Sequence, residues 1–78
     1  MQNLNFVLMG SSPTGLTQIW NVQSVHTGID LGVVKWYSSW RRYAFFPADT
    51  LFDAECLQEI VKFLDEQMLI RTLDRQLR

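Results

Sequence analysis

The chain has 78 residues, of which 47% are hydrophobic and 13% aromatic, and its formal net charge is −1. This length allows one domain with a small core, and the apolar content is typical of a folded chain. The weakly acidic balance argues against binding to duplex DNA, which requires a basic surface. One cysteine excludes an internal disulfide, and no apolar run could span a bilayer, so we expect a soluble cytoplasmic protein with no membrane partner.

The first fifteen residues predict a strand and a loop. Residues 3–9 alternate, with Leu4, Phe6 and Leu8 on one side, which is the pattern of a short strand. The next six residues are rich in Gly, Ser, Pro and Thr, which favour a loop. Residues 1–15 are therefore either an edge strand with its loop or a mobile segment.

Residues 16–47 predict three further antiparallel strands. In residues 16–27, Trp20 and Val22 share one face, and the polar residues opposite them indicate a partly solvated face. Residues 32–38 are rich in β-branched and aromatic side chains, and a short turn leads to residues 41–46. Alternation makes neighbouring rings point to opposite faces. In the last strand it assigns Arg41, Tyr43 and Phe45 to one face and Arg42, Ala44 and Phe46 to the other.

The hydrophobic period changes to that of a helix over residues 53–76. Asp53 fits the N-cap position of this helix. The expected buried stripe is Leu57, Ile60, Val61, Leu64 and Met68, and the expected solvated side is Glu55, Glu59, Lys62 and Glu66. Residues 1–78 thus predict one α+β domain, with an antiparallel sheet of three to four strands and one C-terminal helix packed on one face.

Aromatic and arginine side chains gather around the last two strands. Trp, Tyr and Arg are enriched at binding hot spots, and the same side chains stack on unpaired bases or nucleotides. The alternative is that one face is core and the other an ordinary amphipathic surface. Trp40 is the strongest single candidate, because it sits in a tight turn before two arginines. The candidate binding residues are Lys35, Tyr37, Trp40, Arg41, Arg42 and Tyr43.

The expected helix continues past Met68 with a second apolar row, formed by Ile70, Leu73 and Leu77. A helix that extends beyond a small sheet would expose this row. An exposed apolar row favours self-association, so these three residues are candidates for a homodimer contact.

No pattern in the chain indicates an enzyme, a metal or a cofactor. His26 has no predicted partner, and Cys56 lies at the start of the helix, where a thiolate would be stabilised. A Cys–His pair would still need a third group and an oxyanion element, and neither is visible. One His and one Cys do not make a zinc site, and Asp49, Asp53 and Glu55 lack the spacing of a calcium loop.

Three motifs follow one another in the second half of the chain. They are Leu-Gly-x-Val-Lys-Trp-Tyr at residues 31–37, Trp-Arg-x-Tyr-x-Phe-Phe-Pro at residues 40–47, and a helix start, Phe-x-x-Glu-Cys-Leu, at residues 52–57. In this order they resemble a group of small proteins encoded in bacteriophage and prophage genomes. The resemblance extends to about Glu66, and it implies an origin rather than a particular activity.

Small phage proteins without catalytic motifs commonly act by occupying a host protein. The leading hypothesis is therefore a non-enzymatic protein of the bacterial cytoplasm that binds and inhibits a host protein, for instance a nuclease or another defence component. A second hypothesis is a binder of single-stranded nucleic acid or a small nucleotide, and a third is a structural homo-oligomer.

Overall fold

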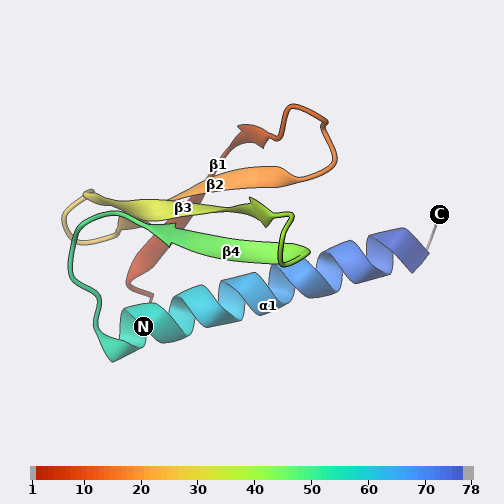
Figure 1. Ribbon diagram of the computed structural model, residues 1–78. Coiled ribbons are helices and arrows are strands. Elements are labelled where there is room, and N and C mark those ends of the chain that lie inside the picture. Colours follow the sequence, from red (N-terminus) through yellow and green to blue (C-terminus); the bar gives the residue numbers. More distant parts are fainter. Residues whose placement is uncertain (1, 77–78) are drawn as a thin grey trace.

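The computed structural model describes residues 2–76, which form an antiparallel sheet with a long helix lying across one face (Figure 1). The elements are β1 (Leu4–Ser11), β2 (Gln18–Ser24), β3 (Asp30–Tyr37), β4 (Arg42–Pro47) and α1 (Ala54–Gln76). The strands lie in the sheet in chain order, so each is joined to the next by a hairpin. The expected α+β architecture is confirmed.

The N-terminal residues form a complete edge strand, which decides between the two alternatives left open by the sequence. Residues Leu4 to Leu8 of β1 pair antiparallel with Ser24 to Trp20 of β2. A bulge between Leu8 and Gly10 shifts the register near the end of the strand. Bulges bend a strand and increase its twist, and β1 turns away from α1 in Figure 1.

The face of the sheet toward α1 carries the core. The Trp20 ring meets Tyr43 edge-on at 5.5 Å and Phe63 at 5.1 Å, and Phe6 stacks on Phe63 at 4.0 Å. Such ring pairs contribute about 0.5–1.5 kcal/mol beyond the burial of their area. Interlocked rings therefore stabilise a domain that is too small for a large aliphatic core. The buried residues are Leu4, Thr17, Trp20, Val22, Leu31, Val34, Tyr43 and Ile60.

The helix begins where the sequence predicts. The Asp53 Oδ1 atom accepts a hydrogen bond from the Cys56 backbone N–H at 2.8 Å, which satisfies one of the free donors at the helix start. The expected buried stripe is only partly correct, because Leu57 and Val61 are 47% and 56% exposed. Phe63 packs against the core instead, since α1 is rotated to bring its ring between Phe6 and Trp20.

Glu59 is half-buried and ties α1 to β1, which corrects its assignment to the solvated side of the helix. Its carboxylate accepts hydrogen bonds from the backbone N–H of Asn3 at 2.9 Å and of Leu4 at 3.2 Å. Burial raises the pKa of the Glu59 carboxyl, but the hydrogen bonds from Asn3 and Leu4 outweigh it and leave the pKa below its ordinary value. The ionised form of Glu59 therefore holds the first strand on the helix.

Candidate interaction surface

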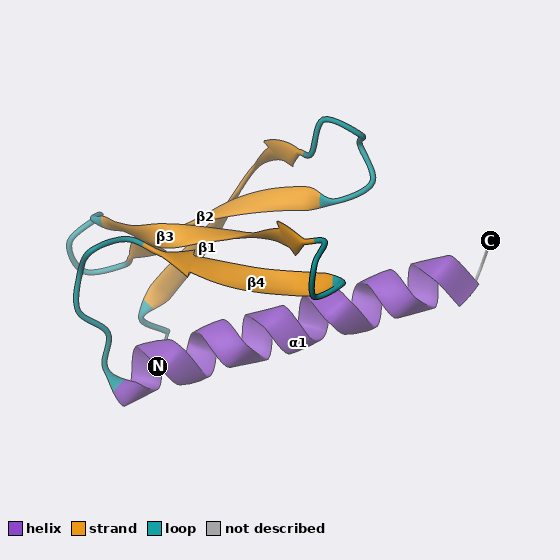
Figure 2. Ribbon diagram, in the orientation of Figure 1, coloured by secondary structure: helices purple, strands orange, loops and turns teal. Residues whose placement is uncertain are grey.

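The second face of the sheet is not covered by the helix, which lies on one side only (Figure 2). We call this second face the open face. Its cross-strand rows follow from the register, in which Val33 lies opposite Phe46, Lys35 opposite Ala44 and Tyr37 opposite Arg42. The alternation predicted from the sequence is confirmed for residues 42–46, because Tyr43 and Phe45 turn toward the helix while Arg42 and Phe46 turn away from it. The assignment of Arg41 to the strand and to the face of Tyr43 is wrong, because Arg41 lies in the turn before β4 and has a positive φ.

Three aromatic rings are contiguous on the open face. Tyr37 lies edge-on to Trp40 with ring centroids 4.9 Å apart, and edge-on to Phe46 at 6.1 Å. The Lys35 ammonium nitrogen lies 4.6 Å from the centre of the Phe46 ring, a cation–π contact. We define the open-face patch as Lys35, Tyr37, Trp40, Arg42 and Phe46, together with Arg41 of the adjoining turn.

The turn between β3 and β4 presents Trp40 to solvent. The Trp40 N–H donates to the Tyr37 carbonyl at 3.1 Å, and the Arg41 N–H donates to the Ser38 carbonyl at 3.2 Å. These bonds fix a tight turn in which Trp40 remains 64% exposed. Arg41 has a φ of 52°, a left-handed conformation that costs roughly 1–2 kcal/mol in a residue with a Cβ atom.

The cations of the patch keep their charges available. Arg42 lies opposite Tyr37, and its Nε–H donates to the Trp40 carbonyl at 3.3 Å. Among residues 2–76, no carboxylate forms an ion pair with Lys35, Arg41 or Arg42. An exposed cation beside an exposed ring is the pairing that hot spots at protein interfaces favour.

The other end of the open face is acidic. Asp30 Oδ1 accepts hydrogen bonds from Asn21 Nδ2 at 2.8 Å and from Gln23 Nε2 at 3.0 Å. The bond from Asn21, followed by that from Gln23, lowers the pKa of Asp30, so this carboxylate is ionised at neutral pH. The open face therefore has a cationic aromatic end and an anionic amide end.

One of the six candidate binding residues belongs to the core. Tyr43 is only 8% exposed, because its ring is edge-on to Trp20 and Trp36 and its hydroxyl oxygen accepts a hydrogen bond from the Gln18 N–H at 3.2 Å. Phe46 takes its place on the open face. Alternation had put Phe46 on the side of Arg42, and this was the signal that could have identified it.

The structure gives His26 and Cys56 no arrangement suited to a catalytic pair. His26 Nε2 lies 3.4 Å from Asn3 Oδ1 in an exposed turn. Burial, and then the neighbouring Asp53, raise the pKa of the Cys56 thiol, which disfavours the nucleophilic thiolate. Over the described residues there is no group of three side chains suited to holding a metal ion.

Two of the three residues of the expected self-association row lie on the C-terminal part of α1. Ile70 is 56% and Leu73 is 50% exposed, and Leu77 lies outside the described residues. In the described chain, α1 is not apolar enough over a sufficient length to cross a membrane.

Comparison of the chain with protein-family models, with curated proteins and with solved structures finds no match. The functional proposal therefore depends on the geometry of the surface.

Proposed function

We propose that the protein is a non-enzymatic interaction protein that binds a partner protein through the open-face patch. The observation that carries this proposal is the contiguous set of Trp40, Tyr37 and Phe46 rings on a sheet face without a covering layer. Buried aromatic anchors surrounded by polar groups supply most of the free energy in protein interfaces. Trp40 is the anchor, since most of its ring is exposed before any partner binds.

The conformation of Arg41 supports a binding role for the turn. Glycine adopts a positive φ without steric cost, whereas arginine does so at the expense of stability. Strained residues of this kind concentrate at functional sites. Arg41 follows Trp40 directly in this turn, where it can meet an acidic group of the partner.

The charge pattern of the face favours a protein over a polyphosphate. A strand of nucleic acid that followed the sheet from the patch would meet the ionised Asp30, which repels phosphate. The whole chain is also slightly acidic. A protein surface with an apolar centre and charges of both signs fits the patch and Asp30 together.

The resemblance to phage and prophage proteins supports a host protein of the bacterial cytoplasm as the partner. A small domain without catalytic groups inhibits such a partner by covering one of its surfaces. Occupation of a nuclease or another defence component is the specific form of the proposal.

A second candidate is binding of single-stranded nucleic acid or a small nucleotide. One observation favours it: exposed rings and cations lie on an antiparallel sheet face, an arrangement on which bases can stack. Salt separates the two candidates. Phosphate binding weakens steeply as salt rises, whereas burial of Trp40 in an apolar pocket does not.

The test is capture from bacterial lysate with the tagged protein, at low and at high salt, with bound protein and nucleic acid identified by mass spectrometry. The variants are Trp40→Ser and the control Leu16→Ser, because Leu16 is 66% exposed and lies outside the patch. We expect a specific protein with wild type and Leu16→Ser, retained at high salt and lost with Trp40→Ser. Capture of nucleic acid that disappears at high salt would replace the proposal by the second candidate.

A further inference from the structure

Along the outer edge of β1, side chains form hydrogen bonds with the outward backbone groups of its first residue, Leu4. The Asn3 carbonyl accepts a hydrogen bond from the Val25 N–H at 2.9 Å, so this carbonyl points toward the chain that follows β2. The next residue faces the opposite way: the Leu4 N–H donates to Glu59 at 3.2 Å, and its carbonyl accepts from Gln2 Nε2 at 2.7 Å. Because backbone groups alternate along an antiparallel strand, those of Phe6 and Leu8 also point away from β2.

The outward backbone groups of Phe6 and Leu8 have no partner among residues 2–76. The opposite edge of the sheet is protected. There the Tyr43 N–H donates to the Met68 sulfur atom at 3.4 Å, and Pro47 has no N–H to offer. Thus β4 is a covered edge and β1 is an open one.

The side chains of β1 do not oppose pairing with another strand. Natural edge strands avoid pairing by carrying charges or proline, and β1 contains neither. Its central residues are apolar and exposed, at 40% for Val7, 55% for Leu8 and 65% for Met9. The length of strand that could pair is limited by the occupied backbone groups of Leu4 at one end and by the bulge after Leu8 at the other.

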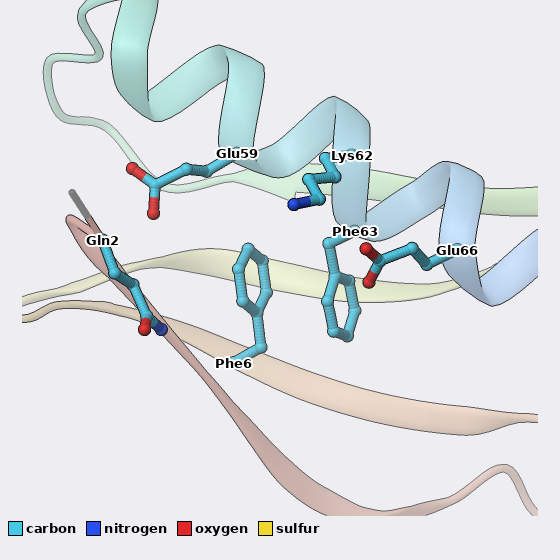
Figure 3. Close-up of a pocket in the computed structure, with 6 residues that line it drawn as sticks. All are labelled: Gln2, Phe6, Glu59, Lys62, Phe63 and Glu66. Atoms are coloured by element: carbon cyan, nitrogen blue, oxygen red, sulfur yellow. The ribbon is translucent and has the colours of Figure 1, made fainter.

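A cavity of about 380 Å³, lined by two aromatic rings and by polar and charged side chains, lies beside this edge, between β1 and α1. The stacked rings of Phe6 and Phe63 line its inner side, as Figure 3 shows, and Glu59, Lys62 and Glu66 of α1 line its outer side. A strand added to β1 would place an alternate side chain next to Phe6, at the mouth of this cavity.

We propose that β1 is a docking edge for a second copy of this chain, which pairs antiparallel through its own β1 about a two-fold axis at Val7. In this register Phe6 of each copy pairs with Leu8 of the other, and the outward N–H and C=O groups of both residues form interchain bonds. Leu8 of the second copy then covers the Phe6 and Phe63 rings at the cavity mouth.

The chemistry of the edge favours a second copy over an unrelated peptide. Two identical strands can pair only antiparallel about such an axis, and this register satisfies the open groups of both. The paired strands themselves bring no charges together, because β1 is uncharged. The paired stretch is short and buries less than the roughly 1,200 Å² of a standard interface, so the dimer forms reversibly as concentration rises.

The dimer goes beyond the proposed function and does not depend on it. Directly opposite residues of antiparallel strands share a face, so the two sheets would join into one with both open faces on the same side. Two open-face patches on one surface would strengthen binding to a partner that presents two sites.

Two measurements test the dimer from about 10 μM to about 1 mM protein: sedimentation equilibrium and residue-specific amide hydrogen exchange. We expect the mass to rise toward that of a dimer, and the Phe6 and Leu8 amides to exchange at least about tenfold more slowly at the higher concentration. Leu8→Lys and Val7→Lys should remain monomeric. Ile29→Lys is the matched control, because Ile29 is 57% exposed in a different turn, and it should still dimerise.

A monomer over the whole range would overturn the proposal. A dimer that survives both Leu8→Lys and Val7→Lys would also overturn it. If Ile70→Lys abolishes the dimer while the two β1 variants keep it, the exposed row of α1 is the contact. Circular dichroism of each variant, compared with wild type, separates a lost dimer from a lost fold.

Discussion

The two faces of the sheet hold the same kinds of side chain in different environments. On the helix side, Tyr43 is 8% exposed and interlocks with Trp20 and Trp36. On the open face, Trp40 is 64% exposed, and its ring lies edge-on to that of Tyr37. Aromatic content alone therefore does not distinguish buried rings from exposed rings. The alternation of the strand does, because it sends adjacent residues to opposite faces.

The largest effect is expected at Gly32, where β3 lies close against the backbone of β4 and the Phe45 ring of the helix side. A Cβ atom at Gly32 would lie 2.5 Å from the Phe46 carbonyl oxygen and 2.7 Å from the Phe45 ring, and Gly32 has a φ of 151°. We expect Gly32→Ala to destabilise the domain by about 2–5 kcal/mol, as crowding and backbone strain add. Urea unfolding followed by circular dichroism measures this loss.

Gly28→Ala is the matched control for this substitution. Gly28 also has a positive φ, of 72°, but a Cβ atom there meets nothing within 4 Å. We expect a loss of only about 1 kcal/mol, from strain alone. Equal losses for the two variants would show that crowding of Gly32 against β4 and the Phe45 ring is not the cause.

The second comparison removes one ring from each side of the sheet. Phe63→Ala deletes a ring that contacts both Phe6 and Trp20, so we expect a loss of about 2–4 kcal/mol of unfolding free energy. Tyr37→Ala deletes a ring of the open face and should cost less than about 1 kcal/mol. Denaturant titration of the two variants checks this difference. A larger loss for Tyr37→Ala would assign a structural role to the open face.

The third prediction concerns acid and the attachment of β1 to α1. Because the pKa of Glu59 is lowered in the folded chain, its stabilising effect is complete above its ordinary pKa, 4.5, and is lost as the pH falls through the lowered pKa. We expect Glu59→Gln to lower the folding stability at neutral pH. We also expect the stability of this variant to fall less than that of wild type as the pH decreases. Thermal melts of both proteins between pH 7 and pH 3 measure this, and parallel curves would contradict it.

The smallest effect on stability is expected at Trp40. Trp40→Phe should change the free energy of unfolding by no more than about 0.5 kcal/mol, because the side chain is mainly exposed. The same substitution should remove most of the fluorescence quenching by acrylamide, since Trp20 is buried and Trp36 is half-buried. Quenching that persists in Trp40→Phe would place a second tryptophan in contact with solvent.

Local chemistry was sufficient to predict much of the fold. The alternation of Trp36 with Tyr37 and of Phe45 with Phe46 correctly divided the rings between the faces. The side chain of Asp53 correctly marked the helix start. These features depend on neighbouring residues and backbone geometry, so a single sequence contains them.

Long-range packing determined what the sequence could not predict. The rotation of α1 depends on the stacking of Phe63 with Phe6, which exposes Val61 although its spacing fits the stripe. A bulge in β3 buries Leu31 against the simple alternation. The burial of Tyr43 was equally hard to predict, because tyrosine is common both at binding hot spots and in protein cores.

The most direct test of the open-face patch is site-specific photocrosslinking in bacterial cells. Benzoylphenylalanine is placed at position 40 in one protein and at position 16, in a residue of similar exposure outside the patch, in another. We expect irradiation to give one discrete protein adduct from position 40 that is absent from position 16. Adducts of equal yield from both positions, or none from position 40 while the fold is intact, would contradict binding of a partner protein through the open face.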